Sequence, residues 1–133
     1  MGLGLNIFKD YKIKQYDEFY DNYETEYIDN QDTSVGYTNV SNIQSILELT
    51  GQSIPRYEWL GHNMKKLELI EPKEMSENIK RSLELLSREE NPRNIRGEFI
   101  FEDVKNEHVN LVEWLEYLLE KSNEGYYLVF DWE

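Results

Sequence analysis

The sequence predicts an α+β fold: one compact domain over residues 1–133, with N- and C-terminal strands in a small antiparallel sheet packed against three or four helices. Three observations predict this class. Apolar and polar residues alternate at the start of the chain, a β-rich run ends it, and apolar residues recur at helical spacing between them. The 133 residues suit a single domain, and the 14% of aromatic residues indicates a chain with a core.

Residues 3–13 predict the first strand. The apolar positions are Leu3, Leu5, Ile7, Tyr11 and Ile13, and Lys9 alone interrupts them. The intervening positions are mostly polar. A period of two places the apolar residues on one side of an extended chain, so we expect a half-buried strand.

Residues 16–27, YDEFYDNYETEY, allow two interpretations. Their tyrosines have the spacing of one helix face. However, Asp17 and Asp21 would repel each other one turn apart, and the composition is a poor helix former. A strand near Thr25–Asp29 that turns back on the first strand, or an irregular loop, is slightly favoured, and the segment stays open.

Two helices are predicted between residues 41 and 67. In the first, Ser41 and Gln44 match a capping box and Gly51 stands where a helix stops. Its buried stripe is Ile43, Ile46 and Leu47. Pro55 is suited to open the second helix, whose apolar residues at helical spacing are Tyr57, Leu60, Met64 and Leu67.

Two further helices and a last strand complete the chain. Pro72 interrupts the preceding segment, and a helix with the apolar face Met75, Ile79, Leu83 and Leu86 follows it. A turn-rich segment, 91–97, leads to EFIF, residues 98–101, a candidate short strand. The strongest helix covers 106–125; its apolar face is Val109 or Leu111, then Val112, Leu115, Leu118 and Leu119, with Gly125 as its stop. In the final run, YYLVFDW, Leu128 and Phe130 oppose Tyr127, Val129 and Asp131, which predicts a strand.

The net charge is −13 and is unevenly spread along the chain. Residues 1–50 carry −6, residues 51–97 carry +1 and residues 98–133 carry −8. If the first and last strands pair, the acidic ends converge on one negative face opposite a neutral helical side. Such a charge repels nucleic acid and anionic membranes and attracts basic proteins. Solubility alone is the simpler explanation, although small soluble domains typically carry only ~2–8 charges.

Motifs for catalysis and cofactors are missing from the sequence. There is no P-loop, dinucleotide fingerprint or nucleophile elbow, and there is no cysteine. His62 and His108 lack metal-ligand spacing, although Asp103 and Glu107 lie near His108. Residues 21–32 fail as an EF-hand because Tyr23 and Glu26 occupy the places of a ligand and a glycine. We expect no enzyme, no cofactor and no metal.

Neither a signal peptide nor a membrane-spanning apolar stretch is evident, so we expect a cytoplasmic protein that binds neither membrane nor nucleic acid directly.

Residues 15–33 are the candidate partner-binding segment. They contain seven acids and no lysine or arginine, interleaved with aromatic rings. Tyrosine supplies contact area at interfaces, and carboxylates steer basic partners. The alternative is that the tyrosines are core and the acids their solvated face. The predicted partner-binding residues are Asp17, Glu18, Asp21, Tyr23, Glu24, Glu26, Tyr27, Asp29 and Asp32, joined by Glu102 and Asp103 from the acidic C-terminal part.

These features lead us to expect an inhibitor or neutraliser of a basic nucleic-acid-handling enzyme or toxin. Small acidic proteins of this size include nucleic-acid mimics, phage anti-defence inhibitors and immunity proteins of nuclease toxins. The likeness lies in size and charge alone. The alternative is an accessory or structural interaction domain of a phage or mobile element, homodimerising through an apolar face at Trp59 or Trp114.

Overall fold

The structure, a computed structural model, describes the backbone of residues 3–17, 22–57 and 69–132 and the side chains of 3–12, 26–56 and 69–131. The described elements are β1 (Leu3–Phe8), β2 (Asp10–Asp17), β3 (Asn22–Ile28), β4 (Gln31–Val35), α1 (Tyr37–Thr50), β5 (Arg56–Tyr57), α2 (Pro72–Arg88), α3 (Val104–Asn123) and β6 (Tyr127–Trp132). This arrangement confirms the expected α+β class.

The main sheet has the strand order β4-β1-β6-β5. Strand β1 pairs antiparallel with β4 on one side and with β6 on the other, with Leu3 opposite Trp132 and Phe8 opposite Tyr127. The first and last strands are therefore neighbours, as expected. The two-residue strand β5 joins the far edge in parallel with β6.

Strands β1 to β4 form one long, bent hairpin. Leu3 lies opposite Val35, and Tyr11 lies opposite Tyr27 in the same constant register. The bend falls at Lys9, whose N–H donates to the Ile28 carbonyl at 2.9 Å, and at Asp29, whose φ of 55° is one that aspartate tolerates better than most residues. The single strand expected over 3–13 was wrong, because the chain forms two strands on either side of Lys9. The strand expected near Thr25–Asp29 is confirmed as β3, and the helical alternative is wrong.

Lys9 explains why the apolar alternation is interrupted at the bend. Its Nζ donates to the carbonyl oxygen of Glu124, the residue that caps the C-terminus of α3, and lies 4.2 Å from the centroid of the Tyr126 ring. A cation is stabilised at this negative end of a helix. Lys9 therefore ties the bend of the hairpin to the end of α3.

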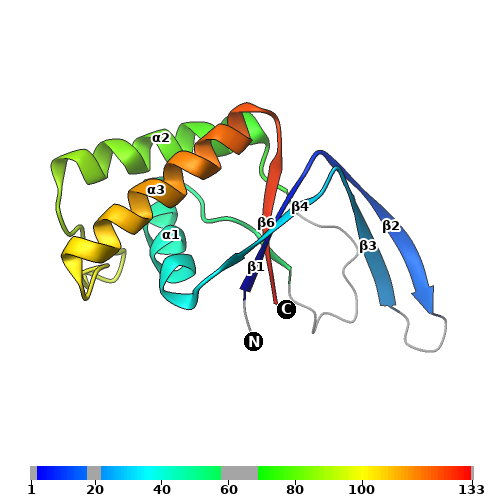
Figure 1. Ribbon diagram of the computed structural model, residues 1–133, viewed down its shortest axis with the longest axis horizontal. Helices are drawn as coiled ribbons and strands as arrows, with labels where there is room; N and C mark the ends of the chain where they lie inside the picture. The colour runs from blue at the N-terminus through cyan, green and yellow to red at the C-terminus, as the bar shows by residue number, and fades with distance from the viewer. Residues whose placement is uncertain (1–2, 18–21, 58–68, 133) are drawn as a thin grey trace.

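The three described helices cover one face of the main sheet, while the β2–β3 ribbon extends away from them (Figure 1). The core between helices and sheet includes the fully buried residues Leu5, Ile7, Ile43, Ile46, Leu47, Ile79, Leu111, Leu115, Leu118 and Phe130. Removing this apolar surface from water is the main stabilising term of such a domain. None of the described helices has the length and apolarity required to cross a membrane.

The opposite face of β1 is also covered, by a smaller group of residues that we call the second core. Phe8 and Val129 are fully buried there, and Tyr11, Tyr27, Leu69 and Tyr127 pack around them. The Tyr27 ring stacks on Phe8 with centroids 4.3 Å apart. The expectation of a half-buried first strand was therefore wrong, since all six residues of β1 are buried.

Helix α1 begins earlier than its sequence pattern predicts. It starts at Tyr37 after Gly36, so Ser41 lies inside the helix and the expected capping box is wrong. The Gln44 amide instead bonds the backbone of Ile54 in both directions, at 2.8 Å each. The predicted buried stripe of Ile43, Ile46 and Leu47 is confirmed.

Helices α2 and α3 match their predicted segments, and Gly125 ends α3 with a φ of 88°. Leu111 is buried and Val109 is 53% exposed, which decides between the two candidates for the α3 face.

One predicted element is not observed, and a second lies mostly outside the described residues. Residues 98–101 form no strand, since Phe99 makes only an isolated bridge to Arg93. At Pro55 the chain enters β5 and not a helix, and Leu60, Met64 and Leu67 lie outside the described residues.

Gly51 gives a first test of the core. A Cβ at this position would lie 2.7 Å from Cγ of the buried Asn78, whose side chain accepts a hydrogen bond from Thr50 Oγ1 and donates to the carbonyls of Leu47 and Gln52. We expect Gly51→Ala to displace this amide and to lower the free energy of unfolding by about 1–3 kcal/mol. Denaturant titration measures the change.

The matched control is Gly36→Ala, because the nearest atom to a Cβ there is Asn39 Nδ2 at 3.9 Å. Equal losses in both variants would show that the contact with Asn78 is not the cause.

Candidate functional site

The bent hairpin carries most of the predicted partner-binding residues. Asp17 ends β2, Tyr23, Glu24, Glu26 and Tyr27 lie on β3, Asp29 forms the bend and Asp32 lies on β4, while Glu18 and Asp21 fall outside the described residues. The strand register places Lys12 opposite Glu26 and Lys14 opposite Glu24. Opposite charges at such positions stabilise a ribbon. Glu24 and Glu26 have no lysine or arginine near them in the sequence, but each therefore has a lysine opposite it on the neighbouring strand.

The aromatic residues of the hairpin are partly accounted for by packing. Tyr27 is half-buried and stacks on Phe8, so at this position the core interpretation applies. The side chain of Tyr23 lies outside the described ones. Asp29 and Asp32 are exposed.

Glu102 and Asp103 lie at the start of α3, at the end of the molecule away from the β2–β3 ribbon (Figure 1). The backbone N–H groups of both residues donate to Glu107 Oε2, at 3.0 and 2.5 Å. The Asp103 carboxylate accepts a hydrogen bond from Asn106 at 2.7 Å. These groups complete the helix N-terminus, and the structure does not bring Glu102 or Asp103 to the hairpin.

The part of the molecule where β4, α1 and α3 meet is poor in bases, and we call it the base-free side. No lysine or arginine occurs between Lys14 and Arg56, or between Lys105 and Lys121. Strands β3 and β4, helix α1 and most of α3 therefore carry no cation. On α3, Glu113, Glu116 and Glu120 are exposed at spacings of three and four, which places them along one helix face. The count of lysine and arginine in the sequence stopped at Thr33; a longer count would have found that none occurs before Arg56.

A groove of about 530 Å³ lies on this side, beside β4. Its lining residues are Thr33 from β4, Asn39 from α1, and Asn110, Glu113, Trp114 and Tyr117 from α3. The Trp114 and Tyr117 rings are half-buried and meet edge to face with centroids 6.0 Å apart. We call this feature the β4 groove. Of the two apolar residues considered for a dimer, Trp114 lies in it and Trp59 lies outside the described residues.

Lys121, at the end of α3, is the nearest lysine in sequence to the Glu113–Glu120 row. Its side chain is only 16% exposed, with Nζ 3.8 Å from the Glu124 carboxylate. Nζ also lies 5.7 Å from the Tyr117 ring centroid and 5.6 Å from that of Tyr126. This cation lies against aromatic rings, and among the described residues its ion pair is with Glu124, which is outside the row.

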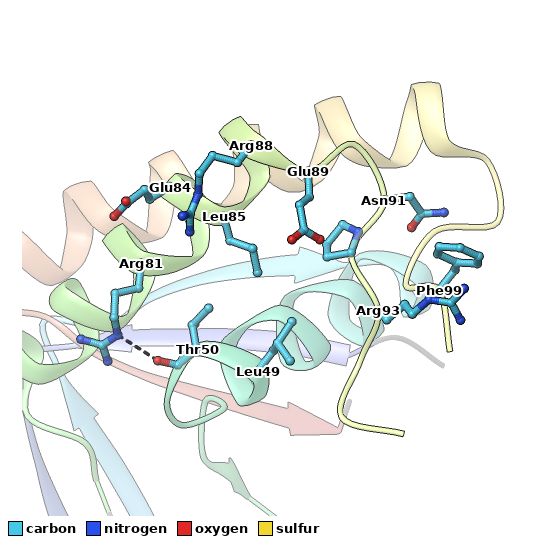
Figure 2. A pocket seen from close by; sticks show the side chains of 11 residues that line it. Leu49, Thr50, Arg81, Glu84, Leu85, Arg88, Glu89, Asn91, Arg93 and Phe99 are labelled. Carbon is cyan, nitrogen blue, oxygen red and sulfur yellow. Dashed lines mark hydrogen bonds between the residues drawn. The ribbon is translucent and has the colours of Figure 1, made fainter. Parts of the chain in front are cut away.

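A second groove, of about 720 Å³, gathers three arginines between α1, α2 and the 91–99 turn (Figure 2). Arg81 Nε donates to the Thr50 carbonyl at 2.8 Å, which satisfies the C-terminus of α1. Arg93 donates to the Gly97 carbonyl at 2.8 Å and stacks 4.0 Å from the Phe99 ring. Arg88 lies in the last turn of α2, where a cation is favoured.

Glu84 and Glu89 line this arginine groove as well, so its charges are mixed. The contacts of Arg81 and Arg93 are those of residues that stabilise helix ends and a turn. We therefore assign the arginine groove a structural role.

Among the described residues, no three histidine, aspartate or glutamate side chains cluster as metal ligands. His108 Nε2 lies 2.9 Å from the Leu86 carbonyl oxygen, and its ring packs edge-on against Phe101. Glu107 accepts from Asn42 Nδ2 at 2.9 Å in addition to its two bonds at the start of α3. His62 lies outside the described residues.

Comparison of the chain with protein-family models, with curated proteins and with solved structures finds no match.

Tyr127 gives a test of the acidic environment beside the second core. Its hydroxyl donates to Glu71 Oε2 at 3.3 Å. Burial raises the pKa of Tyr127 above its usual value of 10.0, and the negative charges of Glu71 and then Asp10 add to the increase. The unfolded chain therefore loses this proton at lower pH than the folded chain. The contribution of the protonated Tyr127 to the free energy of unfolding is complete below the pKa that Tyr127 has in the unfolded chain. It is lost as the pH rises through the pKa that Tyr127 has in the folded chain.

We expect Tyr127→Phe to make the unfolding free energy less dependent on pH above about pH 10. Urea titrations at several alkaline pH values measure the slope. An unchanged slope in the variant would show that Tyr127 does not carry this dependence.

Proposed function

We propose that the chain is a non-catalytic acidic domain that binds a basic protein, specifically a nucleic-acid-handling one, and neutralises it. The observation that carries this proposal is the base-free side: the exposed Glu113 of α3 lines an aromatic groove beside β4, Asp32 is exposed on the same strand, and β3, β4 and α1 carry no lysine or arginine. Each part of that side contributes a different element of recognition.

The carboxylates supply attraction to a partner. Within the described part of the chain, no lysine or arginine forms an ion pair with Asp32, Glu113 or Glu120. Like charges held together on one surface repel each other, and a cationic partner relieves that repulsion. Such a field also accelerates encounter with a basic protein.

The spacing of the row suits a channel built for nucleic acid. Glu113 and Glu120 are separated by about 10 Å along the helix axis, whereas duplex DNA carries a charge every ~1.7 Å of its axis. The carboxylates are thus too sparse to copy every phosphate, but a row of them can occupy alternate cationic sites along such a channel.

The groove supplies affinity beyond charge. Tryptophan and tyrosine are among the residues that dominate binding energy at protein interfaces, especially in pockets at the centre of a contact. Trp114 and Tyr117 are half-buried on α3 and line an open groove. A surface charged only for solubility has no need of such a groove.

A homodimer through Trp114 is less compatible with this surface. It would bring together two copies of Glu113, which lines the groove with Trp114, and like-charge contacts disfavour association.

The test is a matched pair of double charge reversals in the full chain. Glu113→Lys with Glu120→Lys changes the base-free side, while Glu77→Lys with Glu84→Lys makes the same change at the same spacing on exposed positions of α2. The immobilised chain first captures its partner from a lysate of the source organism at low salt. We expect the α3 reversal to weaken binding of the purified partner at least ~10-fold, or about 1.4 kcal/mol, and the α2 reversal to have a smaller effect.

Neutralisation is then measured as inhibition of the partner's nucleic-acid-processing activity, with an end point at one chain per partner. If both reversals weaken partner binding equally, the α3 carboxylates are not a specific binding site and the net charge serves solubility alone. A mass of two chains at both low and high salt would favour the structural dimer.

The carboxylates of the hairpin, on β3 and β4, are better tested by neutral substitutions than by charge reversal. Lysine at position 26 would place two cations opposite each other, because Lys12 lies across the ladder from Glu26. Reversal would therefore disturb the ribbon as well as any interface. We expect the double variant Glu26→Gln, Asp32→Asn to preserve the hairpin. If these residues contact the partner, the variant binds the partner several-fold more weakly, as measured by calorimetric titration.

A further inference from the structure

We propose that the partner engages this domain by strand addition: an extended, basic segment pairs with the free edge of β4 and lays alternate side chains over the β4 groove. This inference rests on the proposed function and specifies its binding mode. It is carried by the edge position of β4, by the groove beside that edge and by the charge around both.

The edge is open on the described part of the molecule. Strand β4 ends the order β4-β1-β6-β5, so it pairs with β1 on one side and with no other described strand on the other. Gln31, Asp32 and Ser34 are exposed along it. A strand at an edge presents alternate N–H and C=O groups that another extended chain can pair with.

The groove lies where an added strand would place its side chains. Thr33, on the helix-facing side of β4, lines it together with Trp114 and Tyr117. An incoming strand lies about 4.8 Å beyond its neighbour and directs every second side chain to the same face of the sheet. Those alternate side chains would therefore lie over the two aromatic rings.

Charge decides the occupant. Asp32 on the edge and Glu113 in the groove are both exposed, and β4 and α1 carry no base. A second copy of the chain would bring two acidic edges together and join two molecules of charge −13. A segment that alternates lysine or arginine with apolar residues places its cations on the groove face, beside Glu113 and over the aromatic rings, while Asp32 on the open edge adds to the attraction. Lys121 of the chain itself already lies 5.7 Å from the Tyr117 ring centroid.

The first experiment uses a synthetic peptide that alternates lysine with valine, titrated into the full chain. Two further peptides carry the same charge but have backbone N-methyl groups on alternate residues, in the two possible phases. Because strand pairing uses the N–H groups of one phase, we expect one methylated peptide to lose at least ~10-fold in affinity and the other to bind as the parent does. Equal affinities of all three peptides, or equal losses in both methylated forms, would overturn strand addition.

The second measurement is amide hydrogen exchange of the wild-type chain with and without the parent peptide and the captured partner. We expect slower exchange within residues 31–35, the segment of β4. The Glu113→Lys variant should bind the peptide several-fold more weakly, and Glu77→Lys on α2 serves as the charge-matched control.

The outcomes separate the two proposals. If the captured partner binds but protects residues other than 31–35, strand addition is overturned while the proposed function stands. If neither the peptide nor any basic protein prefers the wild-type chain over the Glu113→Lys/Glu120→Lys variant, both fail.

Discussion

The burial of β1 on both faces is the constraint on which the rest of the structure depends. Leu5 and Ile7 lie under the helices, and Phe8 fills the second core on the other face. A strand covered on both faces and paired on both sides must occupy the middle of the sheet. Since β6 takes one side of it, the return strand of the hairpin takes the other and becomes the edge. The position of β4, and hence of the groove beside it, follows from β1.

The strongest periodic signals predicted real elements, and the errors have tertiary causes. The apolar repeat from Met75 to Leu86 is satisfied locally by one helix face, so α2 was predictable. In the sequence, Lys9 interrupts the apolar alternation of a single predicted strand. In the structure it lies at a bend and bonds to the C-terminus of α3, 115 residues later in the chain. The capping box at Ser41 failed because α1 starts four residues earlier, and Gln44 is held instead by Ile54.

The candidate site was predictable in its chemistry but not in its assembly. Counting acids identified Asp32 and the segment around it, yet no local pattern reveals that Lys12 faces Glu26 across a ladder. Nor does the sequence show that the start of α3, with Glu102 beside it, lies away from the β2–β3 ribbon, or that Glu113 of α3 lines a groove with Thr33 of β4. These relations depend on strand register and on how helices pack, which are set by contacts between residues distant in sequence.

The acidity of this side and the openness of its edge are best understood together. An unprotected edge strand invites pairing with other copies, and charged side chains are one of the means by which proteins prevent it. Asp32 on the edge of β4 and Glu113 in the groove beside that strand serve this purpose because a second copy would meet its own charges. The same carboxylates do not oppose a basic strand. Charge that keeps the edge free from self-association therefore also selects its partner, so that solubility and recognition are two consequences of one arrangement.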